Sequence, residues 1–128
     1  MSLRVLAVSP DDPAAQVSPD VVLGSHTDLQ ALRTAAAGAA ALTFDHEHVP
    51  GALLDTLVDE GVAVLPGPNA LLYAQDKLAM RRRLADLGAP VPRFAAVQSV
   101  DDVDAFAALV GGALVVKTVR GGYDGRGV

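Results

Sequence analysis

The sequence has no cysteine, no tryptophan, few aromatic residues and no long apolar run. Without cysteine the chain forms neither a disulfide nor a thiolate metal site, and it has no thiol nucleophile. Aromatic residues make up 4% of positions and the net charge is −5, which disfavours nucleic acid, because binding it needs basic surface and stacking rings. No apolar stretch reaches the length of a membrane span, and residues 1–8 lack the features of a signal peptide. We therefore expect a cytoplasmic chain with no membrane or nucleic-acid partner.

Short apolar runs alternate with helical patterns across the first half of the chain. The predicted strands cover residues 3–8, 21–23, 40–44 and 62–65, and the predicted helices cover residues 28–37 and 50–60. Thr27 or Asp28 is expected to cap the first helix, and Pro50 suits the first turn of the second. Strands that alternate with helices over short links pair in parallel through right-handed crossovers. The sequence therefore predicts an α/β fold with an open parallel sheet and helices on its faces.

The second half begins after the break Pro66-Gly67-Pro68. Asn69 is a suitable cap for a long helix over residues 69–88, and the proline-rich residues 89–92 indicate a domain hinge. A strand over 93–98, a helix over 101–110, a strand over 113–119 and a glycine-rich turn over 121–127 are predicted next. Only Val128 follows this turn, so we expect half of a supersecondary unit to be missing.

Lys117 lies in the apolar run 113–119, directly before the glycine-rich turn. An unpaired ammonium is costly to bury, so Lys117 either covers apolar surface with its stem or binds an anionic ligand. Four glycines within residues 121–127 allow the backbone to approach a phosphate. The turn matches neither the Walker pattern nor the dinucleotide pattern, so a plain hairpin turn remains an alternative. The lysine and the turn together favour a nucleotide.

Lys77 is the other lysine of the chain. In a continuous helix it would share one stripe with four mostly apolar residues, Tyr73, Met80, Leu84 and Leu87. Lys77 then either extends its ammonium to solvent or binds the same anionic ligand as Lys117. The neighbouring Arg81, Arg82 and Arg83 point in three directions around the helix, which is typical of a solvated surface.

The polar run Asp45-His46-Glu47-His48 directly follows the predicted strand 40–44. Open α/β sheets bind ligands at the carboxyl ends of their strands, so a polar substrate pocket is one interpretation. If the run is extended, the two carboxylates face one way and the two histidines the other. A metal site from His46 and His48 is weaker because no third ligand is near, and a loop of capping groups before Pro50 is the remaining alternative. His26 and Tyr73 are interpreted as structural.

Five segments carry a resemblance to a known family. They are residues 43–50, Pro66-Gly67-Pro68, Gln75-Asp76-Lys77, Val116-Lys117 and, most specifically, Gly121-Gly122-Tyr123-Asp124-Gly125-Arg126-Gly127. In order and spacing they resemble the 5-(carboxyamino)imidazole ribonucleotide synthase family of ATP-grasp ligases, over essentially the whole chain. The corresponding loop of other ATP-grasp enzymes looks different, so Tyr123 and Asp124 favour this family.

The resemblance implies a ligase that uses ATP and Mg²⁺ to join bicarbonate to the exocyclic amine of aminoimidazole ribonucleotide in purine biosynthesis. ADP and phosphate are the other products, and bicarbonate is activated as carboxyphosphate. The implied organisation is a Rossmann-like pre-ATP-grasp domain over residues 1–68, a connecting helix over 69–88 and the start of an ATP-grasp domain over 89–128. The full-length enzyme is expected to be a homodimer.

The resemblance also implies roles for individual residues. The implied ATP contacts are Lys77, Lys117, Gly121, Gly122, Gly125 and Gly127. The implied substrate contacts are Glu47, Tyr123, Asp124 and Arg126, and the last two are the implied catalytic residues. The Mg²⁺ ligands are expected outside this chain, and no metal ligand is assigned within it.

The chain also departs from the family pattern. It starts at what looks like the family's second strand, and the family continues far beyond Val128, so we expect this chain to be inactive alone. A first alternative is another ATP-grasp ligase, as in glycinamide ribonucleotide transformylation or biotin carboxylation, which Tyr123 and Asp124 disfavour. A second alternative is a non-catalytic nucleotide-binding α/β module, because fold alone does not assign function.

Overall fold

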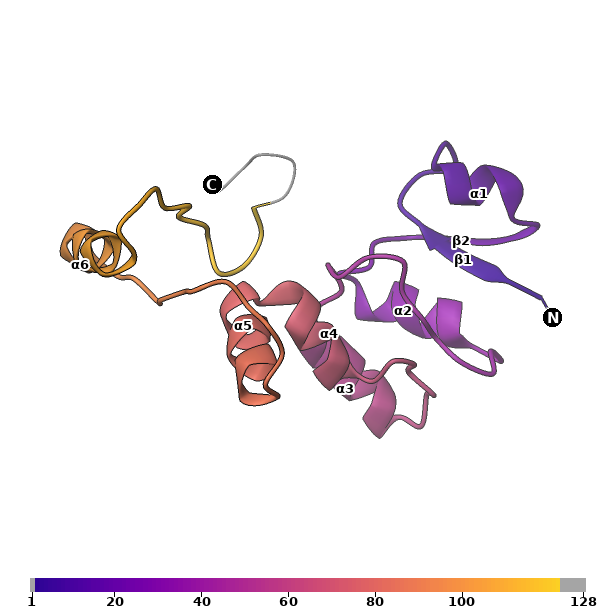
Figure 1. Ribbon diagram of the computed structural model, residues 1–128. Helices are drawn as coiled ribbons and strands as arrows, with labels where there is room; N and C mark the ends of the chain where they lie inside the picture. Colours follow the sequence, from indigo (N-terminus) through magenta and orange to yellow (C-terminus); the bar gives the residue numbers. More distant parts are fainter. Residues whose placement is uncertain (1, 123–128) are drawn as a thin grey trace. The chain divides into compact units, whose positions relative to one another are not determined.

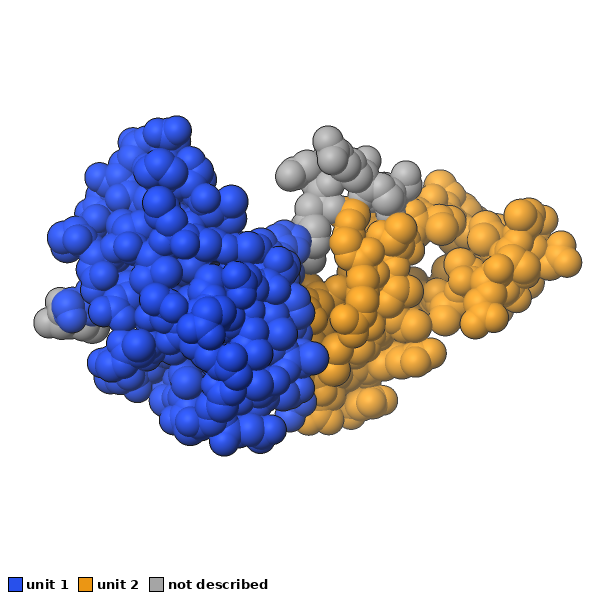
Figure 2. Space-filling view, turned by 180° about the vertical axis from the view of Figure 1, so that it is seen from behind, with its two compact units in different colours: residues 1–71 blue, residues 72–128 orange. Residues whose placement is uncertain are grey.

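The computed structural model describes residues 2–122. The chain divides into two compact units, residues 1–71 and 72–128 (Figure 2). No helix among the described residues combines the length and the apolar character needed to cross a membrane.

A parallel pair of strands opens the first unit (Figure 1). Strand β1 (Arg4–Ala7) pairs with β2 (Asp20–Leu23), with Val5 opposite Val21 and Leu6 opposite Val22. The short helix α1 (Pro13–Val17) connects them and begins at a proline, whose fixed φ suits a first helical turn. The predicted α/β class with parallel pairing is thereby confirmed.

Helix α2 (Leu29–Ala36) follows β2 and is held at both ends by side chains. The Asp28 carboxylate accepts from the backbone N–H of Gln30 at 2.8 Å, as the sequence predicted for the cap. At the other end Arg4 donates to the carbonyl of Ala37 at 2.7 Å and forms an ion pair with Asp20. Arg4 therefore ties the first strand to the second and to the end of the helix.

Gly24 lets the end of β2 lie directly against α2. A Cβ at this position would lie 2.6 Å from the Cβ of Ala31, well inside van der Waals contact. Glycine is therefore required here by close packing.

The hydrophobic core of the first unit is built around helix α3 (Gly51–Asp59), whose Leu54 and Leu57 are fully buried. The other buried members of this cluster are Leu32, Val49, Val64 and Leu71. The predicted strands 40–44 and 62–65 meet in parallel as expected, but only through one bridge between Leu42 and Val64. The helix prediction for 50–60 is confirmed with small shifts at its ends.

The predicted single helix over residues 69–88 is wrong, because two helices, α4 (Pro68–Gln75) and α5 (Lys77–Asp86), occupy this stretch. Asp76 separates them. Its carboxylate accepts from the backbone N–H of Ala79 at 2.8 Å and thus starts a new helix. A short acidic side chain competes with the backbone carbonyls for such N–H groups, so it favours a cap over a helix interior. Tyr73 and Lys77 therefore lie on different helices and do not share one helical face.

Helix α6 (Val100–Val110) confirms the prediction for 101–110. Ser99 and Asp102 form a reciprocal capping box at its start, and Gly111, with φ +72°, ends it. The predicted strands 93–98 and 113–119 are wrong for the described chain, where neither segment forms a ladder. Val115 is 70% exposed and Val116 50% exposed, as expected for apolar side chains with no sheet beneath them.

Candidate functional site

The first candidate region is the polar turn Asp45–His48, placed between two anchors in the core of the first unit. Phe44 packs against that core on one side, and Val49, 4% exposed, belongs to it on the other. The backbone bends at residues 45–47, so the run is not extended and the alternation of carboxylates and histidines that an extended run would give does not apply. Glu47 is half-buried, whereas the other three residues of the turn are exposed.

The three histidines of the chain gather at this turn. The backbone N–H of His48 donates to Nδ1 of His46 at 3.1 Å, and their ring centroids lie 5.2 Å apart. The ring of His26 meets that of His46 edge-on at 4.9 Å. Partial burial lowers the pKa of His26, and the nearby His46 and His48 lower it further.

His26 was interpreted as structural, yet the structure brings it into this cluster. A topological signal was present in the sequence. Residues 25–28 follow the carboxyl end of one predicted strand, and residues 45–48 follow the carboxyl end of the next. Carboxyl ends of parallel strands meet at the same edge of a sheet, so loops that follow them come together.

The arrangement of the histidines does not form a metal site. Within residues 2–122 there is no group of three histidine, aspartate or glutamate side chains placed to hold a metal ion. In addition, Nδ1 of His46 already accepts a backbone hydrogen bond. The geometry instead suits recognition of a polar molecule by Glu47, the half-buried carboxylate of the turn.

The second candidate region lies in the second unit, where Lys77 contacts the start of the glycine-rich turn. The Lys77 ammonium donates to the carbonyl of Gly121, and the Lys77 backbone N–H donates to the carbonyl of Val119 at 3.0 Å. Gly121 and Gly122 have φ values of +67° and +74°, a region that only glycine enters without strain. The structure thus brings together a lysine and a turn that are separated by 44 positions in the sequence.

Asp76 stabilises the same junction. Besides capping α5, its carboxylate accepts from Nε of Arg120 at 3.2 Å. The pKa of Asp76 is lowered, first by the backbone N–H of Ala79 and then by Arg120. One carboxylate therefore fixes both the start of the helix that carries Lys77 and the residue before Gly121.

Lys117 lies exposed on the segment 112–120. The expectation that Lys117 lies within an apolar strand is wrong for the described chain, because residues 113–119 do not form a strand. The remaining predicted site residues, Tyr123, Asp124, Gly125, Arg126 and Gly127, lie outside the described residues. Their assignments stay predictions.

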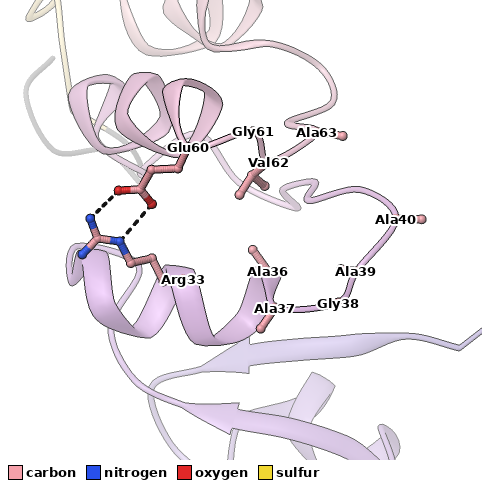
Figure 3. Close-up of a pocket in the computed structure, with 10 residues that line it drawn as sticks. All are labelled: Arg33, Ala36, Ala37, Gly38, Ala39, Ala40, Glu60, Gly61, Val62 and Ala63. Atoms are coloured by element: carbon pink, nitrogen blue, oxygen red, sulfur yellow. Dashed lines mark hydrogen bonds and ion pairs between the residues drawn. The ribbon is translucent and has the colours of Figure 1, made fainter.

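A hollow of about 410 Å³ opens between the ends of α2 and α3 (Figure 3). Arg33 and Glu60 form an ion pair across it, and most of the remaining lining is alanine and glycine. None of the predicted site residues lines this hollow. It offers a ligand little chemistry because its two charged groups already satisfy each other.

The fold and the two candidate regions define an α/β chain of the pre-ATP-grasp and ATP-grasp class. Residues 1–75 match the ribonucleotide synthetase preATP-grasp domain, and residues 82–128 match the ATP-grasp domain. The chain belongs to the ribonucleotide synthetase preATP-grasp family. The resemblance found in the motifs is confirmed, whereas the boundaries predicted at residues 68 and 88 stay predictions.

Relatives with a named activity match almost the whole chain. The N5-carboxyaminoimidazole ribonucleotide synthase of Mycobacterium tuberculosis H37Rv is 65% identical over 127 residues, which are 99% of this chain and 30% of the relative. The synthase of Corynebacterium ammoniagenes is 55% identical, over 99% of this chain and 31% of that protein. The chain therefore spans about a third of the length of these relatives.

Solved structures agree with the sequence relatives. The Staphylococcus aureus N5-carboxyaminoimidazole synthetase, complexed with ADP, superposes with a TM-score of 0.87 at 28% identity. The superposition covers 98% of this chain and 34% of the Staphylococcus protein. The Thermotoga maritima synthetase gives a TM-score of 0.81 at 28% identity, over 94% of this chain and 32% of that protein.

Proposed function

We propose that this chain supplies part of the active site of an ATP-dependent ligase that carboxylates 5-aminoimidazole ribonucleotide. Bicarbonate becomes joined to the exocyclic amine, giving 5-(carboxyamino)imidazole ribonucleotide, ADP and phosphate in cytoplasmic purine biosynthesis. The observation that carries the proposal is the 65% identity to the Mycobacterium tuberculosis synthase over 127 residues. We expect the full-length enzyme to act as a homodimer.

The nucleotide side of the proposed site lies in the second unit. Lys77 and Lys117 bind ATP phosphates, and Gly121, Gly122, Gly125 and Gly127 let the turn close over them. The contact between Lys77 and Gly121 supports this assignment, because it places an ammonium beside a backbone that glycine leaves free to move toward a phosphate. Cations fixed around a transferring phosphoryl group stabilise its developing charge.

The substrate side of the proposed site includes Glu47, Tyr123, Asp124 and Arg126, with Asp124 and Arg126 as catalytic residues. Glu47 supports this assignment, since it is the half-buried carboxylate at the strand-end edge where α/β sheets bind ligands. Mg²⁺, which offsets phosphate charge in such reactions, is bound by residues outside this chain.

The test uses a full-length chimaera in which this chain replaces the matching 127 residues of the Mycobacterium tuberculosis synthase. ADP release from the chimaera is expected to require both bicarbonate and aminoimidazole ribonucleotide. Lys77→Met and Lys117→Met are each expected to lower kcat/KM for ATP by about 100-fold, the usual effect of removing one preorganised electrostatic contact. Arg82→Met, on the exposed face of α5, is the matched control and should behave like the parent.

Two results would contradict the proposal. The first is a well-folded chimaera that releases no ADP in response to aminoimidazole ribonucleotide. The second is parental kinetics in both lysine variants. The 128-residue chain by itself is expected to release no ADP under the same conditions, because the proposed Mg²⁺ ligands are absent from it.

A further inference from the structure

The turn that carries Glu47 is held by an imidazole. Nδ1 of His46 accepts the backbone N–H of His48 at 3.1 Å, so the hydrogen bond spans Glu47 and closes the turn around it. Asparagine and aspartate side chains make the same kind of bond two residues along, where it fixes the backbone in a turn. The backbone direction at Glu47 is therefore set in part by the side chain before it.

The position of this bond matters because both ends of the turn are already fixed. Phe44 and Val49 pack in the core of the first unit, and the residues between them bend away from it. A bond from His46 to His48 removes backbone freedom from the middle of that span, where Glu47 lies. A carboxylate that binds a ligand benefits from such preorganisation, because less freedom is lost on binding.

The bond also fixes which nitrogen of the His46 ring is the acceptor. A ring nitrogen that accepts an N–H donor carries no proton, so the ring proton is on Nε2. The Asp45 carboxylate lies 4.0 Å from Nε2 and favours the proton there.

The geometry points to His46 as a positioning residue that holds Glu47 in its binding orientation through the Nδ1 acceptor. This inference rests on the proposed role of Glu47 as a substrate contact. Loss of the acceptor removes the bond to His48 and loosens the turn that carries Glu47. Binding of the ribonucleotide should therefore weaken while ATP binding does not.

The experiment measures KM for aminoimidazole ribonucleotide and for ATP in the full-length chimaera. His46→Phe keeps a ring but has no acceptor, and it should raise KM for the ribonucleotide about tenfold with KM for ATP unchanged. His46→Asn keeps an acceptor for the His48 N–H, so it should restore the parental KM within about twofold.

His26→Asn is the matched control, because it removes an imidazole from the same cluster and leaves the hydrogen bond between His46 and His48 in place. It should keep the parental KM within about twofold. Parental KM for the ribonucleotide in His46→Phe would overturn the positioning role. A KM in His46→Asn as high as in His46→Phe would overturn the role of the acceptor.

Hydrogen exchange of the amides over residues 45–49 separates this inference from the proposed function. Exchange in the chimaera should be faster in His46→Phe than in the parent, and parental in His46→Asn. Faster exchange with no ribonucleotide-dependent ADP release in any variant would reject the proposed function and with it the role of Glu47. Equal exchange in all three proteins would reject the constraint itself, whatever the activity.

Discussion

The two units of this chain are similar in apolar content but differ in burial. The first unit encloses Leu54 and Leu57 completely, together with four further buried members of the same cluster. In the second unit no side chain among residues 72–122 is buried, and Leu87, Val100 and Val115 are each more than 60% exposed. The first unit is held by a hydrophobic core, whereas the described part of the second is held by caps, an ion pair and contacts to the glycine-rich turn. Apolar residues stabilise a unit only where other segments cover them.

The largest expected effect tests that comparison directly. Leu54→Ala in the 128-residue chain should lower the free energy of unfolding by about 2–5 kcal/mol, because it leaves a cavity in a filled core. Val116→Ala, at a half-exposed position of the second unit, should change it by less than about 0.5 kcal/mol. Urea unfolding followed by circular dichroism measures both, and equal losses would contradict the difference between the units.

A smaller loss of folding stability is expected at Gly24, where the chain after β2 touches helix α2. Gly24→Ala places a methyl group against Ala31 and should cost about 1–3 kcal/mol, since the end of β2 and α2 must move apart. Gly67→Ala is the control, because a Cβ at Gly67 meets nothing within 4 Å. Only Gly24→Ala should lower the urea midpoint, and equal midpoints in the two variants would contradict the close contact between Gly24 and Ala31.

In the second unit, the largest loss of stability is expected when the polar contacts of Asp76 are removed. Asp76→Ala removes the cap of α5 and the partner of Arg120, and loss of a cap typically costs about 1 kcal/mol. Asp76→Asn keeps a capping oxygen and loses only the charge. In the chimaera, hydrogen exchange over residues 76–86 and KM for ATP should both rise more in Asp76→Ala than in Asp76→Asn. Unchanged exchange in both variants would mean that packing, not the cap, holds this helix.

The smallest expected effect is a pH dependence of the first unit. Hydrogen bonds from Arg33 lower the pKa of Glu60 below its ordinary value. A carboxylate with a lowered folded-state pKa adds stability that is present above its unfolded pKa and is lost as the pH falls through the folded pKa. Glu60→Gln should therefore destabilise slightly at neutral pH and flatten the loss of stability below about pH 4.5. Identical acid unfolding curves for parent and variant would show that the exposed ion pair of Arg33 and Glu60 adds nothing to folding stability.

One of the caps predicted from the sequence was correct and another was wrong. Asp28 caps α2, because its side chain accepts from an N–H group only two residues away. Asn69, also predicted as a cap, lies inside α4 (Pro68–Gln75). Asp76 uses the same chemistry as Asp28, but it stands in a run of helix-forming residues, so propensity predicted a continuous helix through it. Because the helix is not continuous, Lys77 does not share an apolar stripe with Tyr73, and that argument for a buried Lys77 does not hold. The structure nevertheless places Lys77 against the glycine-rich turn.

Predictions that depended on a distant partner were less accurate. The apolar run 113–119 has the composition of a strand, yet a strand exists only when another segment supplies its hydrogen bonds, and the described chain has none beside it. Of the two predicted strands that follow α2 and α3, a single bridge at Leu42 and Val64 remains. The family, in contrast, was predicted correctly, since short motifs in fixed order depend on residue identity and not on the geometry of the surrounding fold.

The class of fold, the Asp28 cap and the family could be read from the amino-acid sequence, because each depends on neighbouring residues or on recurring motifs. The contacts of His26 with His46 and of Lys77 with Gly121 appear only in the folded chain, because they join residues 20 and 44 positions apart. The first forms where loops that follow parallel strands meet at one edge, and the second forms where Asp76 binds Arg120 beside the glycine-rich turn.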